Sequence, residues 1–293
     1  MNPFSLNIKG RLVTYDTPVV MGILNVTPDS FYSGSRAFDD NTLFQRIKQL
    51  VSEGADIIDI GGYSTRPGAV DISEDEEIDR LARGMRILKE VSRDIIVSVD
   101  TFRANVALVA VKELGCDIVN DISGGNIDDS MLSVVTDLNV PYILTHGRGT
   151  PADMAGKTYY SDVTADVLTE LGEKLRILAL GGVNDVIVDP GIGFAKTTSQ
   201  NYELIRNLEV FQVLHRPLLV GVSRKSLITK CLSVTPEEAL PGTIALNALC
   251  LDRGAAILRV HDIKAARHCI DIYNAVSGIN TNKNINFKTS DNA

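Results

Sequence analysis

Short runs rich in Val, Ile and Leu recur along the 293-residue chain, separated by polar and amphipathic stretches. Within each run the apolar residues are nearly continuous rather than alternating, which is typical of parallel strands covered on both faces. Each run has the length of a strand. We therefore predict eight strands, over residues 19–27, 56–62, 95–100, 118–123, 141–147, 186–192, 217–223 and 257–262.

The segments between these runs have the periodicity of amphipathic helices. Residues 43–55 repeat apolar side chains at helical spacing, and residues 72–91 contain Ser73 and Glu76 at the spacing of a capping box. Eight β-then-α units favour an α/β fold of the (β/α)8 TIM barrel type over an open doubly wound sheet, which remains the structural alternative. No linker divides the chain, so we expect a single domain. A short N-terminal cap, the barrel and a polar tail expected to be disordered would cover residues 1–18, 19–278 and 279–293.

The overall charge limits the classes of partner. The chain has 29 Lys and Arg against 37 Asp and Glu, a net charge of −8, which argues against nucleic acid or an anionic membrane as the main partner. No apolar run has the length of a membrane span, and residues 1–13 lack the apolar core of a signal peptide. The four cysteines form no C-x-x-C pair, so we expect free, buried thiols and a cytoplasmic protein.

Polar side chains collect where the predicted strands end, which in a TIM barrel is the rim that carries the active site. Side chains alternate along a strand, so Arg259 and His261 share one face of the last strand, where packing does not explain them. An ion pair of Arg259 with Asp59 or Asp100 would explain one apolar strand that carries charged side chains. Several such strands that converge at the rim indicate a site. The polar residues at or near these ends are Asn25, Asp100, Asn120, His146, Asp189, Ser223–Lys225, Arg259 and His261.

Two rim loops and one glycine-containing segment have sequences that suit ligand binding. Residues 25–36 are polar and long enough for a mobile lid, although they are equally compatible with a plain connection. Residues 61–70 offer glycines, hydroxyls and Arg66 to an anionic group. The segment DPGIGFAKT (189–197) is superficially like a P-loop, but Ala195 stands where that motif requires glycine, so we exclude nucleotide hydrolysis.

The residue types at the rim predict two kinds of contact. Carboxylates such as Asp100 and Asp189 bind pairs of ring N–H groups, because both oxygens accept hydrogen bonds in one plane. Metal binding by these two aspartates is the competing interpretation, which no His/Cys cluster supports. Lys225 could donate to the same ring, its alternative being a surface salt bridge. Asn120 lies between the two aspartates in chain order.

A basic group is predicted on the other side of the site. Arg259, His261, Thr65 and Arg66 form a candidate oxyanion group, because arginine suits bidentate phosphate contacts and histidine adds a donor. The residues together therefore predict a pocket for a nitrogen heterocycle joined to a phosphate or diphosphate.

Seven segments, in order, resemble the motifs of the dihydropteroate synthase family, and the resemblance covers essentially the whole barrel, from about residue 7 to 278. The family likeness implies a TIM-barrel transferase of folate biosynthesis, a target of sulfonamides. It condenses (7,8-dihydropterin-6-yl)methyl diphosphate with 4-aminobenzoate to 7,8-dihydropteroate and diphosphate. The segments are GILNVTPDSF (22–31), ADIIDIGGYSTRPGA (55–69), VSVDTF (97–102), IVNDISGG (118–125), VDPGIGFAK (188–196), VGVSRKS (220–226) and LRVHD (258–262).

The resemblance also implies roles for individual residues, a Mg²⁺ ion and a homodimer. Asn25 would bind a Mg²⁺ that also holds the diphosphate, and catalysis is assigned to Asp100, Lys225, Arg259 and His261. Closure of loops 27–39 and 63–71 would exclude water, so shortening 27–39 is expected to lower turnover. The contacts implied are Thr65, Arg259 and His261 with diphosphate, Asp100, Asn120, Asp189 and Lys225 with the pterin, and Phe194, Arg66 and Ser226 with 4-aminobenzoate.

One segment departs from the family pattern. In LTHGRGTP (144–151), Thr145 and Gly147 stand where many relatives have a methionine on each side of the histidine, which puts the shape of the pterin pocket in doubt. Two other functions stay open. One is a pterin-dependent methyltransferase of the same barrel type, and the other is a non-catalytic paralogue that binds pterin.

Overall fold

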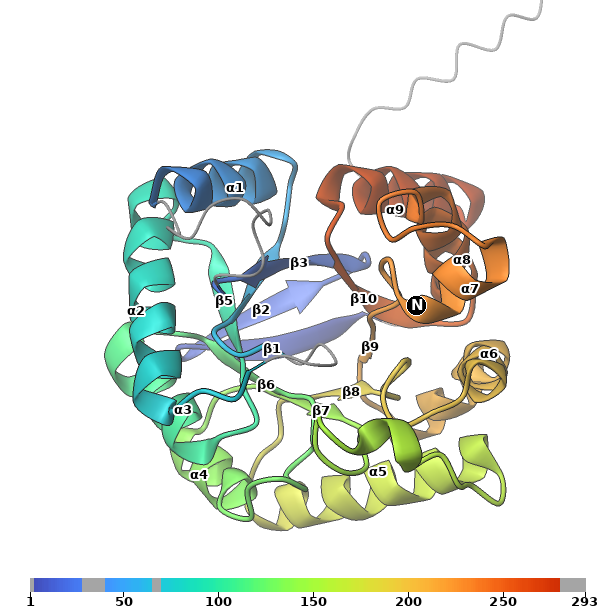
Figure 1. The fold of residues 1–293 in the computed structure, drawn as a ribbon, viewed down its shortest axis with the longest axis horizontal. Coiled ribbons are helices and arrows are strands. Elements are labelled where there is room, and N and C mark those ends of the chain that lie inside the picture. Colours follow the sequence, from blue (N-terminus) through green and yellow to red (C-terminus); the bar gives the residue numbers. More distant parts are fainter. Residues whose placement is uncertain (1–2, 28–39, 65–69, 280–293) are drawn as a thin grey trace, which may run out of the picture.

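Eight parallel strands form a closed barrel in this computed structural model, which describes residues 3–27, 40–64 and 70–279 (Figure 1). The strands follow one another around the barrel in chain order, and the last strand pairs with the first to close it. All eight predicted strands are confirmed, and so is the TIM barrel. They are β3 (Val19–Asn25), β4 (Ile57–Gly61), β5 (Ile96–Asp100), β6 (Ile118–Asp121), β7 (Tyr142–Thr145), β8 (Val186–Asp189), β9 (Leu218–Val220) and β10 (Ala255–Val260).

Helices surround the barrel as an outer ring (Figure 1). The two helices predicted from periodicity correspond to α1 and α2, and Ser73 caps α2 by accepting a hydrogen bond from the Glu76 N–H at 3.2 Å. The helices are α1 (Asp40–Ser52), α2 (Glu74–Val91), α3 (Ala104–Val109) with its π-helical continuation η2 (Ala110–Leu114), α4 (Met131–Leu138), α5 (Val163–Leu180), α6 (Thr198–Arg206), α7 (Ser226–Leu232), α8 (Leu240–Asp252) and α9 (Ile263–Val276). Two short 3₁₀ segments are η3 (Met154–Gly156) and η4 (Leu208–Leu214).

The predicted N-terminal cap contains a hairpin of β1 (Phe4–Ile8) and β2 (Arg11–Tyr15), which lies across the middle of the ring in Figure 1. Leu6 and Ile8 belong to the same buried cluster as inward-facing residues near the amino ends of the barrel strands, such as Ile57 and Ile187. The Asn7 N–H also donates to Asp185 at 3.0 Å. The hairpin therefore fills one end of the barrel, and the opposite rim remains for a site.

Alternation along the strands separates a packed outer face from a polar inner face at that rim. In β4, Ile58 and Ile60 pack outward in the main core, whereas Ile57 and Asp59 take the other face. β10 runs from Ala255 to Val260, about two residues earlier than predicted, so Arg259 lies near its carboxyl end. The predicted tail, apart from residue 279, lies outside the described residues.

The four cysteines are free, as predicted, but Cys231 is exposed rather than buried. It lies near the carboxyl end of α7, and the sequence pattern did not show that this position faces outward. Within the described ranges, no helix is long and apolar enough to cross a membrane.

Candidate active site

A cleft of about 830 Å³ opens at the carboxyl ends of the barrel strands. Asn120 and Asp189 are buried at the ends of β6 and β8 and do not contribute to its lining. Thr65 and Arg66 fall outside the described residues, as do most of the two predicted lid loops. The predicted site residues that line the cleft are Asn25, Asp100, Phe194, Lys225, Ser226, Arg259 and His261.

Two carboxylates hold Arg259 at the floor of the cleft. Its Nε donates to Asp59 Oδ2 at 2.6 Å and its Nη2 donates to Asp100 Oδ2. Asn120 Nδ2 donates to the same Asp59 oxygen at 2.9 Å. Asp59 is fully buried, whereas the side chains of Arg259 and Asp100 remain 17% and 18% exposed. The guanidinium is thereby fixed in orientation while one side of it faces the cleft.

Burial and charge shift the pKa values of this group. Burial raises the pKa of Asp100 to about 7, although the neighbouring Arg259 opposes the shift. Burial acts to lower the pKa of Arg259, but the charges of Asp59 and Asp100 more than offset it, and the net pKa is raised. Arg259 therefore stays a cation at every physiological pH.

Lys225 lines the same cleft from the turn after β9, the strand next to β10. Its Nζ donates to the Ile192 carbonyl and lies 4.4 Å from the centroid of the Phe194 ring, a cation–π distance. Burial lowers the pKa of Lys225 to about 8, while the charge of Asp189 favours the ammonium form. Burial raises the pKa of Asp189, and the Lys225 charge opposes that shift. The opposite charges of the two residues thus favour each other's ionised form.

The neighbouring cation, Arg224, stabilises the backbone around the cleft rather than pairing with Asp189. Its backbone is left-handed, with φ +55°, and its side chain is directed to Asp262 rather than to the Lys225 partners. Nε and Nη2 donate to the Asp262 carboxylate at 2.8 and 2.9 Å, and Nη1 donates to the carbonyls of Pro236 and Glu237. Arg224 therefore ties the turn before α7 to the end of β10 and to the loop before α8.

His261 completes the basic side of the cleft. Burial, aided by the charge of Arg259, lowers the pKa of His261 to about 4, so the imidazole is neutral near pH 7. Its backbone is held at both ends, because its N–H donates to Ser223 Oγ at 3.2 Å and its carbonyl accepts from Arg46 Nη2 at 2.7 Å. His261 can therefore supply a neutral donor beside a fixed cation.

Comparison with known proteins places this arrangement in one family. The family described as pterin binding enzyme matches residues 21–261. A dihydropteroate synthase of Bacillus subtilis is 44% identical over 263 residues, which are 88% of this chain and 89% of that protein. The chain belongs to the dihydropteroate synthase family.

Solved structures of this family share the fold over nearly the whole chain. Dihydropteroate synthase from Xanthomonas albilineans with 4-aminobenzoic acid superposes with a TM-score of 0.85 at 35% identity, covering 94% of this chain and 99% of that one. The same enzyme in complex with 7,8-dihydropteroate gives a TM-score of 0.83 at 32% identity, covering 94% and 100%. The recognition made from the seven sequence segments is confirmed.

The segment that departs from the dihydropteroate synthase pattern has a structural explanation at Gly147. A Cβ at this position would lie 2.6 Å from the Ile122 carbonyl oxygen, so this backbone path leaves no room for a methionine. Thr145 is buried at the end of β7, where it pairs in register with Asp189. The two loops after β6 and β7 are therefore packed more closely than a methionine at 147 would allow.

Few side-chain oxygens among the described residues are available for the magnesium ion that the dihydropteroate synthase family implies. The described residues contain no group of three His, Cys, Asp or Glu side chains suited to hold a metal. However, Asn25 Oδ1 lies 3.8 Å from the point where a Cβ on Gly61 would stand and belongs to a residue that lines the cleft, whereas the nearby Asp100 Oδ2 already accepts from Arg259. Mg²⁺ keeps several waters and needs few protein oxygens when a substrate phosphate is bound.

Sequence reasoning missed several groups that the fold brings to this family's site. Asp59 was considered only as an ion-pair partner, yet it organises both Arg259 and Asn120. Arg46 was missed because it lies on α1, and a cation on an amphipathic helix is usually interpreted as a solvent-exposed residue. The remaining lining residues include Thr27, Tyr63 and Ser64, which belong to the two predicted rim loops but were not singled out, and Glu237, which was not predicted.

Proposed function

We propose that this chain condenses (7,8-dihydropterin-6-yl)methyl diphosphate with 4-aminobenzoate, giving 7,8-dihydropteroate and diphosphate. The observation that carries the proposal is one cleft lined by Asp100, Lys225, Arg259 and His261, with Asp189 buried at the end of β8. This chemistry matches a pterin ring joined to a diphosphate. A family that includes 7,8-dihydropteroate and 4-aminobenzoate complexes supports the same substrates.

The pterin is assigned to the acidic and amide groups. Asp189 Oδ1 already accepts a hydrogen bond from the Gly191 N–H at 2.8 Å, which fixes the carboxylate plane. We assign the N–H pair of the ring to this carboxylate, because both of its oxygens can accept in one plane. Lys225 donates to a ring oxygen or nitrogen, and Asn120 and Asp100 complete the pocket.

The diphosphate is assigned to Arg259 and His261, together with Thr65. Within the described part of the chain, the acceptors of Arg259 engage Nε and Nη2, so Nη1 is the nitrogen offered to a phosphate oxygen. His261 adds a neutral donor. When bound at Asn25, Mg²⁺ would neutralise diphosphate charge. These groups stabilise the negative charge that collects on the oxygens as the C–O bond breaks.

The second half of the reaction forms the new C–N bond. The electrons of the C–O bond leave with diphosphate, the methylene carbon becomes electron-poor, and the amine lone pair of 4-aminobenzoate attacks it. The amine then loses a proton. We place 4-aminobenzoate beside Phe194 and Ser226, with Arg66 as a further contact, where no strongly basic side chain is needed because a neutral aromatic amine is already a nucleophile.

Three further expectations belong to this proposal. Residues 19–278 form one pterin-binding domain, and the protein is cytoplasmic, in keeping with its free thiols. It is a homodimer, with no nucleic-acid or membrane partner. Apolar side chains on neighbouring helices support the homodimer, since Leu232, Leu249, Ile272 and Val276 are between 46% and 84% exposed.

The test of the proposed function is product formation by the purified protein. The pterin diphosphate, 4-aminobenzoate and Mg²⁺ are mixed with it, and 7,8-dihydropteroate is identified by mass. Formation of this product supports the proposal. A folded protein that binds the pterin without forming the product would contradict it and favour the non-catalytic paralogue.

A further inference from the structure

Lys196 is a buried cation to which the proposed reaction gives no role. It is 9% exposed and follows the loop 190–195 after β8, in the segment whose likeness to a P-loop was rejected. Its Nζ lies 2.9 Å from the Gly191 carbonyl oxygen, 3.0 Å from that of Phe194 and 3.0 Å from His146 Nδ1. One ammonium group thus joins two points of its own loop to the loop after β7.

The backbone of this loop needs such a tie. Gly191, Gly193 and Ala195 have φ values of +72°, +92° and +49°, so every second residue is left-handed. For Ala195 this conformation costs about 1 kcal/mol. A Cβ on Gly191 would lie 1.9 Å from the His146 carbonyl oxygen, so the loop also rests directly against its neighbour. Contacts outside the loop must therefore hold it in place.

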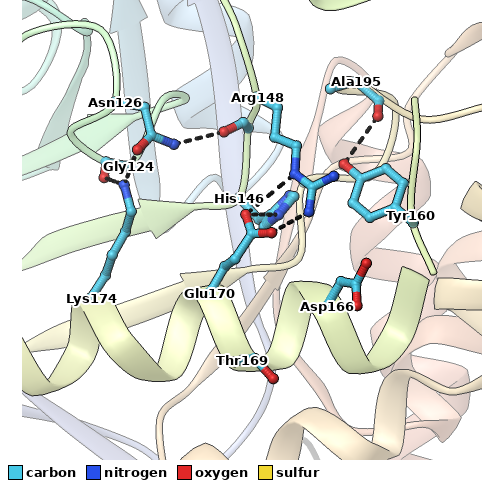
Figure 2. A network of polar contacts seen from close by, with 12 residues as sticks. Gly124, Asn126, His146, Arg148, Tyr160, Asp166, Thr169, Glu170, Lys174 and Ala195 are labelled. Carbon is cyan, nitrogen blue, oxygen red and sulfur yellow. Dashed lines mark hydrogen bonds and ion pairs between the residues drawn. The ribbon is translucent and has the colours of Figure 1, made fainter. Parts of the chain in front are cut away.

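The charges around Lys196 define the proton positions. An ammonium group only donates, so His146 Nδ1 accepts from Lys196 and His146 Nε2 carries the proton, which it donates to Glu170 Oε2 at 3.0 Å. Burial lowers the pKa of His146, in agreement with this neutral tautomer. Glu170 is in turn held by Arg148, as Figure 2 shows. The chain of contacts runs from Lys196 through His146 and Glu170 to Arg148.

The protonated form of Lys196 suits this environment. Burial lowers its pKa to about 7, whereas the charge of Asp189 favours the cation. Nζ lies within 3.4 Å of His146 Nδ1 and of three carbonyl oxygens, those of His146, Gly191 and Phe194, and the ammonium form offers them three donors where the neutral amine offers two.

The loop that Lys196 holds also forms the surroundings of Lys225. The Ile192 carbonyl accepts from Lys225 Nζ, the Phe194 ring lies against the same atom, and a Cβ on Gly193 would lie 2.9 Å from Lys225 Cδ. We propose that Lys196 is a positioning residue for the condensation. Its ammonium group fixes loop 190–195 so that this loop holds Lys225 in place against the pterin. The inference rests on the function proposed above.

The test compares two lysines that tie different loops of the same barrel. Lys174 on α5 donates to the Gly124 carbonyl and to Asn126 Oδ1, so it holds the loop after β6 but does not contact loop 190–195 (Figure 2). Lys196→Met and Lys174→Met are assayed for the KM of the pterin diphosphate and for kcat. We expect the KM to rise by about tenfold or more in Lys196→Met and to change by less than about twofold in Lys174→Met.

A merely structural role would give a different result. It would reduce the fraction of folded enzyme, which lowers the apparent kcat and leaves the KM unchanged. A folded Lys196→Met with the wild-type KM would therefore overturn the inference, as would equal effects of both variants.

A milder variant covers the case in which Lys196→Met does not fold. Tyr160 Oη donates to the Ala195 carbonyl at 3.1 Å, so Tyr160→Phe removes a second tie from the same loop (Figure 2). If the loop positions Lys225, the KM of Tyr160→Phe for the pterin diphosphate rises by about two- to fivefold. An unchanged KM refutes the positioning role of the loop. If the wild type makes no dihydropteroate, the proposed function fails separately. Calorimetric Kd values for 6-hydroxymethyl-7,8-dihydropterin on the same proteins then test the role of Lys196, with the same two outcomes.

Discussion

Asp59 is expected to be the residue whose charge matters most to the floor of the cleft. The substitution Asp59→Asn keeps the size of the side chain but removes its charge, while Asp100 remains as a partner of Arg259. Asp59 Oδ2 accepts from Arg259 Nε at 2.6 Å and from Asn120 Nδ2 at 2.9 Å, so one oxygen serves two donors. The carbonyl oxygen of an asparagine can still accept from them, but its amide nitrogen cannot.

The magnitude follows from these contacts. Breaking a buried ion pair costs about 3–5 kcal/mol when one partner is truncated. The cost is smaller here, because Asp100 still compensates Arg259 and because Asp59 Oδ1 has no partner among the described residues. We expect Asp59→Asn to lower the free energy of unfolding by about 2 kcal/mol and kcat/KM by about tenfold or more.

Urea unfolding and steady-state kinetics measure the two effects, and Asp56→Asn is the matched control. Asp56 lies three residues earlier and also pairs with an arginine, Arg267, but its side chain is 34% exposed. An ion pair with this exposure contributes about 1 kcal/mol or less, and the control should keep its kinetics. Equal stability and kcat/KM in Asp59→Asn and the wild type would refute this view of the cleft floor.

Three further predictions concern other parts of the rim. Lys225→Ala should weaken pterin binding by about tenfold to a hundredfold in calorimetry, because a charge-assisted hydrogen bond is lost, and wild-type affinity would refute the assignment. His261 has its pKa lowered to about 4 from 6.5, so the unfolded chain binds more protons between these values and stability falls as the pH drops through this window. Over this window His261→Gln should lose up to about 3 kcal/mol less of its free energy of unfolding than the wild type. Identical stability–pH profiles of wild type and variant would contradict this prediction. Gly191→Ala should lower the free energy of unfolding by about 3 kcal/mol or more through its contact with His146, whereas Gly182→Ala, which is also left-handed but open, should cost about 1 kcal/mol. Similar losses in the two glycine variants would show that the contact at Gly191 has no effect.

The barrel itself could be predicted from sequence because its strands are buried on both faces. Continuous Val, Ile and Leu then mark each strand, and the polar residue that ends it marks the rim. Asn25, Asp100 and Lys225 could be placed in this way, since position along a strand determines which end of the barrel a side chain reaches.

The pairings within the site could not be predicted, because they join residues far apart in the chain. Asp59 and Arg259 are 200 positions apart. Sequence reasoning considered Asp59 and Asp100 as alternative partners of Arg259, whereas in the fold Arg259 pairs with both. Lys196 was judged only against a P-loop pattern. Its actual contacts depend on how two loops from neighbouring strands pack, which no periodicity records.

The most direct test of the proposed reaction is the ratio of its two products. Dihydropteroate and diphosphate are measured together during turnover of the wild-type protein, with and without 4-aminobenzoate. The proposed condensation predicts equal amounts of the two products, and little diphosphate when 4-aminobenzoate is omitted. Diphosphate released at the same rate without 4-aminobenzoate, or no dihydropteroate in its presence, would contradict a cleft built to join the two substrates.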